Sequence, residues 1–184
     1  MRHILSAGLV GGLVVFCWSA VDHMLLPFGE MGLTQIPADK EPAVLEPLKE
    51  LPGRGLYMYP RLEGKDTAAH EAWMQKVANG PSGLLLYHPA GAPVMNAGTF
   101  AGEIGADVLA ALIAAFVLAQ LTLRGLLARA GVVSLLGVFA WLSISLSYLI
   151  WYGYPAAFVL AEGVDQAVGW FLGGLAMAWV IRGR

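Results

Sequence analysis

Long apolar runs dominate the sequence and restrict its fold more than any other feature. They occupy about residues 4–20, 106–123, 132–151 and 156–181. A helix needs about 20 apolar residues, at about 1.5 Å of rise each, to cross about 30 Å of hydrocarbon. Only 13% of the residues are charged, whereas a soluble domain carries about 25%. We therefore predict a membrane all-α four-helix bundle, with transmembrane helices over about 1–20, 103–123, 131–151 and 156–181.

Arginines outside the long loop predict the orientation of this bundle. They precede the first run or lie between or beyond the last three, at Arg2, Arg124, Arg129, Arg182 and Arg184. By the positive-inside rule, both termini are cytoplasmic and residues 21–100 are extracytoplasmic. The expected location is the bacterial inner (cytoplasmic) membrane. The alternative of a cleaved signal peptide is disfavoured because Trp18 stands where a small residue is required.

The loop of residues 21–100 is too long for a simple connector and carries its own structural signals. Asp66 or Thr67 is placed to cap a helix that ends before Asn79-Gly80-Pro81. Residues 55–60 and 83–88 have strand-like composition and are separated by turn signals. We expect a small α+β extracytoplasmic domain between the first two transmembrane helices.

Three segments give the chain a resemblance to known proteins. They are Gly55-Leu-Tyr-Met-Tyr-Pro60, residues 80–88 (GPSGLLLYH), and residues 105–115 (GADVLAALIAA). On these motifs the chain resembles small uncharacterised bacterial four-helix membrane proteins, a family that brings no activity with it. One helix, a large outer loop and three further helices also resembles the claudin layout in outline, by shape only.

Small residues recur at helical spacing in the first and last runs. Gly8 and Gly12 form one GxxxG motif, and Gly169 and Gly173 form another. Such faces let helix backbones approach closely in a membrane. We expect intramolecular packing through these glycines; a surface for partner helices is the alternative.

Four carboxylates fall within or beside the predicted helices. Glu103 and Asp107 share a face of the second helix, and Glu162 and Asp165 lie three residues apart on the fourth. Ionisable residues inside a membrane are costly and are functional candidates. We place these four near the outer interface, where hydrogen bonds to the loop or to helix ends would satisfy them. The alternative is a proton or cation path, which predicts that both pairs converge in one water-accessible cavity.

Other chemistries have weaker support in the sequence. His23, His70 and His88 accompany several methionines in the loop, which leaves extracytoplasmic binding of copper or a small ligand as an alternative. No histidine lies at hydrocarbon depth, so the sequence predicts no haem or other cofactor. Cys17 is the only cysteine, so we predict no cysteine-based metal site. No nucleophile elbow, P-loop or dinucleotide fingerprint occurs, and we predict no catalytic residues.

These observations favour a non-enzymatic accessory or scaffolding subunit of a larger membrane complex. Respiratory and photosynthetic complexes are the natural hosts. The partners would be the lipid bilayer and other membrane subunits; a net charge of −2 gives no attraction to nucleic acid. A small transporter or membrane enzyme that uses the carboxylates is the second hypothesis.

Overall fold

The computed structural model describes residues 1–91 and 95–181, and these form two compact units. Residues 1–33 and 95–181 make up the helical unit, and residues 34–91 make up the loop unit. Each unit has its own secondary structure. Arg182 and Arg184, which were used to predict the orientation, lie outside the described residues.

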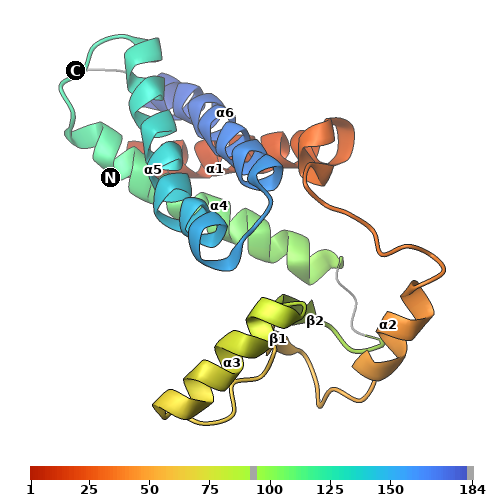
Figure 1. The fold of residues 1–184 in the computed structure, drawn as a ribbon. Coiled ribbons are helices and arrows are strands. Elements are labelled where there is room, and N and C mark those ends of the chain that lie inside the picture. The colour runs from red at the N-terminus through yellow and green to blue at the C-terminus, as the bar shows by residue number, and fades with distance from the viewer. Residues whose placement is uncertain (92–94, 182–184) are drawn as a thin grey trace. The chain divides into compact units, whose positions relative to one another are not determined.

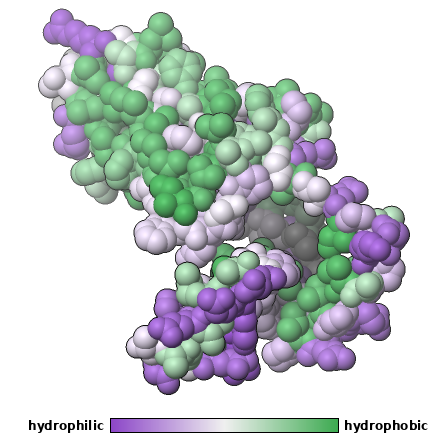
Figure 2. Space-filling view, viewed as in Figure 1, coloured by the Kyte–Doolittle hydropathy of each residue, from purple (hydrophilic) through white to green (hydrophobic). Residues whose placement is uncertain are grey.

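The helical unit is built from long α-helices (Figure 1). They are α1 (Arg2–Leu25), α4 (Ala97–Gln120), α5 (Leu126–Tyr152) and α6 (Ala156–Val180). Among the described residues, α1, α4 and α5 are long and apolar enough to cross a membrane. The visible face of this unit is largely covered by apolar side chains (Figure 2). These features are those of a membrane protein.

The fourth predicted span, α6, is not among the three helices that meet this description. It has 25 residues, but Glu162, Asp165 and Gln166 interrupt its apolar sequence. The stretch that follows them is shorter than the roughly 20 residues that a crossing requires. A membrane-spanning bundle of four helices therefore stays a prediction.

Two helices extend beyond the predicted ends of the long loop. α1 continues past Ala20 to Leu25 and is followed by a short 3-10 helix, η1 (Pro27–Glu30). α4 begins at Ala97, where the Asn96 side chain accepts hydrogen bonds from the backbone N–H groups of Gly98 (2.8 Å) and Thr99 (3.1 Å). This cap satisfies amide groups that the first helical turn leaves unpaired. Both ends of the predicted loop, residues 21–100, therefore belong to the helical unit.

Within the helical unit, α1 packs against both α4 and α6, and α5 packs along α6. Most of the buried core side chains are small or medium-sized. The core comprises Ala7, Ala111, Ala114, Ala115, Leu118, Val133, Met177 and Ala178. Small side chains permit close helix contacts where lipid, being apolar itself, provides no hydrophobic drive for association.

The glycines of both GxxxG motifs lie at contacts inside the chain. A Cβ on Gly8 would lie 2.8 Å from the Leu112 Cα of α4, and one on Gly12 would lie 2.6 Å from the Val108 Cα. On α6, a Cβ on Gly169 would meet Trp18, and one on Gly173 would meet Val15. These glycines are therefore occupied by α1–α4 and α1–α6 packing and do not offer a free surface to another helix.

The loop unit consists of two short helices and a two-stranded sheet. Its elements are α2 (Glu41–Leu48), β1 (Gly55–Tyr59), α3 (Thr67–Asn79) and β2 (Gly83–Tyr87). The strands pair antiparallel, with Tyr57 opposite Leu85, and Asp66 caps α3 by accepting a 2.7 Å hydrogen bond from the Ala69 N–H. The predicted α+β character of this segment is confirmed.

Ser134 provides a test of the α5–α6 contact. Its Oγ donates a 2.7 Å hydrogen bond to the Ala167 carbonyl of α6, whereas Ser143 Oγ donates to Ala140 within α5 itself. Hydrogen bonds between helices in a membrane contribute about 0.6 kcal/mol on average. We expect Ser134→Ala to lower the unfolding free energy in detergent by about 0.5–1 kcal/mol. The matched control Ser143→Ala should change it by less, and equal effects would contradict the proposed interhelical role.

Candidate functional site

The last turns of α1 carry a buried aspartate. Asp22 is only 2% exposed, and its Oδ2 lies 3.6 Å from Nδ1 of the neighbouring His23. The same ring nitrogen lies 3.0 Å from the Ser19 carbonyl oxygen, one turn earlier. Oδ1 of Asp22 is buried and has no hydrogen-bond partner among the described residues. An acceptor held in this way is costly unless a proton or a cation satisfies it.

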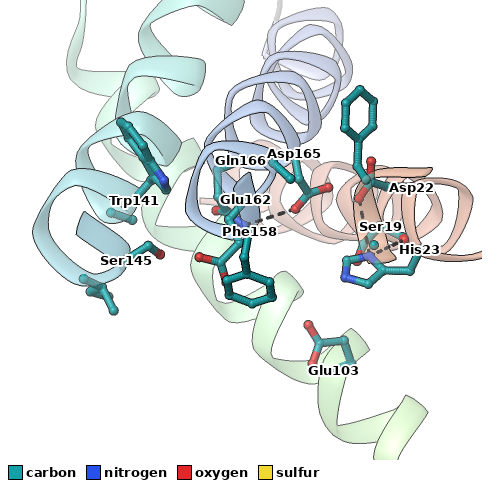
Figure 3. A pocket seen from close by; sticks show the side chains of 15 residues that line it. Ser19, Asp22, His23, Glu103, Trp141, Ser145, Phe158, Glu162, Asp165 and Gln166 are labelled. Carbon is teal, nitrogen blue, oxygen red and sulfur yellow. Dashed lines mark hydrogen bonds and ion pairs between the residues drawn. The ribbon is translucent and has the colours of Figure 1, made fainter. Parts of the chain in front are cut away.

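The first half of α6 supplies a polar chain that positions a second aspartate. Trp170 Nε1 donates a 3.0 Å hydrogen bond to Gln166 Oε1. Gln166 Nε2 in turn donates to Asp165 Oδ2 at 3.4 Å. Both the donor and the acceptor of the Gln166 amide are used, and Asp165 lies on the side of α6 that faces Asp22 of α1 (Figure 3). The other oxygen, Asp165 Oδ1, is buried with no hydrogen-bond partner among the described residues, and the Trp18 side chain lies close enough to interact with this carboxylate.

α4 contributes the third carboxylate position. Asp107 is close enough to Glu103 and to Asp165 for their charges to interact, and Asp165 interacts in the same way with Asp22. Carboxylates from α1, α4 and α6 therefore approach one another inside the helical unit. Because α4 begins at Ala97 and not near residue 103, Asp107 lies near the middle of its helix, deeper along it than the sequence indicated.

Asp22, Glu103 and Asp165 line a cavity of about 580 Å³. Its polar lining includes Ser19, Asp22, His23, Glu103, Ser145, Glu162, Asp165 and Gln166, and its aromatic lining includes Phe28, Trp141 and Phe158. All of these lie in the half of the unit where α1 and α5 end and α4 and α6 begin. A smaller cavity of about 80 Å³, lined in part by Trp18 and Asp107, shares Glu103, Asp165 and Gln166 with the larger one. The carboxylates thus form a continuous acidic lining from the larger cavity into the helix contacts.

The charge of this lining is unbalanced. Buried carboxylate oxygens without a hydrogen-bond partner occur at Asp22, Asp107, Glu162 and Asp165. Neither Lys nor Arg lines either cavity among the described residues, and His23 is their one basic lining residue. An unpaired charge in a low-dielectric site costs several kcal/mol. The site therefore favours bound protons or a bound cation.

The side chains around the two cavities do not form a preorganised metal site among the described residues. In the described part of the chain, no three His, Cys, Asp or Glu side chains are grouped closely enough to hold a metal ion. The three histidines of the predicted loop site are divided between the units. His23 belongs to the helical unit, whereas His70 lies in the loop unit, where its ring is 5.7 Å from that of Trp73.

The structure brings together all four carboxylates singled out in the sequence. Glu103, Asp107, Glu162 and Asp165 line one cavity or the other. Sequence reasoning missed Asp22 because the first helix was expected to end at Ala20. A useful signal was present: Asp22 lies one helical turn from Trp18 and Ser19, so a slightly longer helix would have placed all three on one face.

Comparison with known proteins gives no relative for this chain: no protein-family model, curated protein or solved structure matches it. Its own geometry defines a helical protein with three helices long and apolar enough to cross a membrane and with an acidic cavity, in the described part of the chain. The resemblance to small bacterial four-helix membrane proteins stays a prediction.

Proposed function

We propose that the helical unit binds a small organic cation in its carboxylate-lined cavity and that the protein is a small cation transporter. The observation that carries this proposal is the gathering of buried, unpartnered carboxylate oxygens from α1, α4 and α6 on two adjoining cavities that share Asp165. A positive ligand would satisfy these oxygens and offset their mutual repulsion. The acidic lining lowers the stability of the protein without ligand, and the same charges would provide the affinity for a cation.

The size and walls of the cavity favour an organic ammonium group over a bare ion. A volume of about 580 Å³ lies within the usual range of small-molecule sites, about 300–1,000 Å³. Phe28, Trp141 and Phe158 supply aromatic walls, and aromatic faces attract ammonium groups. Trp141 is fixed because its Nε1 donates a 2.7 Å hydrogen bond to the Val159 carbonyl of α6, so its ring is available as a preformed wall.

The positions of Asp107 and Asp165 support transport in addition to binding. Both lie near the middle of helices of 24 and 25 residues. Transporters commonly place their substrate and coupling-ion sites near the bilayer midplane. A cation that enters the larger cavity past Glu103 and Glu162 would meet Asp165 next and then Asp107, which lines only the smaller cavity.

Ligand-dependent stability tests the binding step. Purified protein in nanodiscs should be stabilised saturably by methylammonium or tetramethylammonium, since a ligand at 100 times its Kd adds about 2.7 kcal/mol to the unfolding free energy. Sodium chloride at equal ionic strength should give a smaller shift. The control variant Glu30→Gln should be stabilised by ammonium ions as much as the unchanged protein, because Glu30 is exposed in η1 and lines neither cavity. If no ammonium ion gives more stabilisation than sodium, the proposal is wrong.

A second function, the accessory or scaffolding subunit predicted from the sequence, is favoured by a different observation. Leu56, Met58 and Leu86 of the loop-unit sheet are each more than half exposed, and Leu56 pairs directly with Leu86. Such a patch is typical of a protein contact. Extraction in mild detergent followed by native electrophoresis would decide this: a stable assembly with other subunits supports it, and a lone monomer opposes it.

A further inference from the structure

A second cavity lies at the opposite end of the helical unit, where α1 begins and α4 and α6 end. Its volume is about 800 Å³. Its walls come from the first turn of α1, the linker between α4 and α5, the start of α5 and the end of α6. The linker lies beside these helix ends (Figure 1). This cavity shares no lining residue with the acidic one.

The charge of this second cavity is opposite to that of the first. Arg124, Arg129 and His3 line it, together with the polar side chains of Gln120 and Thr122, and its described lining contains no Asp or Glu. Arg129 is only 6% exposed. It is a buried guanidinium that has no carboxylate partner among the described ion pairs.

Part of the Arg129 side chain caps the C-terminal end of α6. Nη1 donates to the carbonyl oxygens of Ala178 (3.4 Å) and Ile181, which satisfies carbonyls that the last helical turn leaves free. Nε, however, is buried with no hydrogen-bond partner in the part of the chain that the structure describes. A buried charge with an unused donor is costly unless an anion completes the site.

The backbone adds further donors at the same place. α5 begins at Leu126 with no side-chain cap on its first turn, so free N–H groups and the positive end of the helix dipole lie next to Arg124 and Arg129. Arginine and a helix N-terminus are both good ligands for phosphate oxygens.

We propose that this cavity binds the phosphate group of an anionic ligand, and that its walls select an anionic phospholipid. Beside the basic groups the lining is apolar, with Ile4, Leu121, Leu123, Val180 and Ile181. Such a surface suits the glycerol and upper acyl chains of a lipid and gives nothing to free phosphate. Basic pockets between transmembrane helices bind anionic lipid headgroups in this way.

The test compares lipids and inorganic phosphate on the full chain. In phosphatidylcholine nanodiscs, added phosphatidylglycerol should raise the unfolding temperature and should be retained in native mass spectrometry. Inorganic phosphate should give a smaller shift. Arg124→Gln should weaken phosphatidylglycerol binding about tenfold, by removing one charge-assisted hydrogen bond. Arg61→Gln, an exposed arginine of the loop unit, is the matched control.

Arg129→Lys separates charge from geometry, because lysine keeps the charge but loses the planar guanidinium. We expect weaker phosphatidylglycerol binding than in the unchanged protein. If inorganic phosphate stabilises as well as the lipid does, the cavity is a phosphate site without lipid selection. Equal retention of phosphatidylcholine and phosphatidylglycerol, or an Arg124→Gln variant that binds phosphatidylglycerol normally, would overturn the proposal.

Discussion

Asp165→Asn is expected to abolish cation binding while leaving the fold at least as stable as before. The amide has the same shape as the carboxylate, so Gln166 and Trp170 keep their packing around it. The change removes a charge that interacts with those of Asp22 and Asp107. We therefore expect an unfolding free energy that is unchanged or higher by up to about 1 kcal/mol. The ammonium-dependent stabilisation should be lost at the same time.

The expected loss of transport is large. A hydrogen bond to a charged group contributes about 1.5–3 kcal/mol, and each 1.4 kcal/mol is about tenfold in affinity. Uptake of labelled methylammonium into proteoliposomes by Asp165→Asn should therefore fall at least about tenfold at subsaturating concentration. Asp107→Asn should behave similarly, and Glu30→Gln should transport normally. A variant that loses stability but keeps uptake would show that Asp165 is a structural residue.

Stability and uptake have to be measured on the same variant, because a carboxylate with only a structural role would give the reverse result: lower stability with normal uptake. If Asp165 served only to anchor Gln166, its substitution would weaken the helix contacts and leave ligand responses intact. Residues that lower stability in order to bind a ligand are the common origin of a trade-off between stability and activity. The four carboxylates that each have one buried oxygen without a hydrogen-bond partner among the described residues are those at which such a trade-off is expected here.

The sequence predicted the long helices well because bilayer crossing requires long apolar runs, and these are visible in any single chain. It also predicted strands within residues 55–60 and 83–88, since turn residues bound both segments, and the structure has them at 55–59 and 83–87. Helix ends were less predictable. α4 begins at Ala97 because Asn96 caps it, but Asn96 stands in a stretch of small residues where hydropathy marks no boundary.

The acidic cavity depends on tertiary structure that hydropathy does not encode. Glu103 and Asp107 on one helix and Glu162 and Asp165 on another are visible as pairs, but whether they face one another depends on how α4 and α6 rotate about α1. That rotation is fixed by Gly8 and Gly12 against α4 and by Gly173 against α1. The glycine contacts and the carboxylate site are therefore parts of one arrangement.

Gly12→Ala is expected to be strongly destabilising because the added methyl group would overlap with α4 at the α1–α4 contact that holds the carboxylates together. The new methyl group would lie 2.6 Å from the Val108 Cα and 2.7 Å from the Val108 backbone nitrogen. Backbone atoms cannot rotate away as a side chain does, so α1 and α4 must separate. Overpacking of this kind costs about 1–3 kcal/mol, and the midpoint of thermal unfolding in detergent should fall by several degrees.

Gly105→Ala provides the matched control, because a Cβ there would meet nothing within 4 Å. Alanine is favoured over glycine in a helix by about 0.8–1 kcal/mol, so this variant should be as stable as the unchanged protein or more so. The same separation of α1 from α4 would draw Asp22 away from Asp107 and weaken ammonium binding in Gly12→Ala but not in Gly105→Ala. If Gly12→Ala unfolds at the normal temperature and binds normally, the close α1–α4 contact does not hold the carboxylates together.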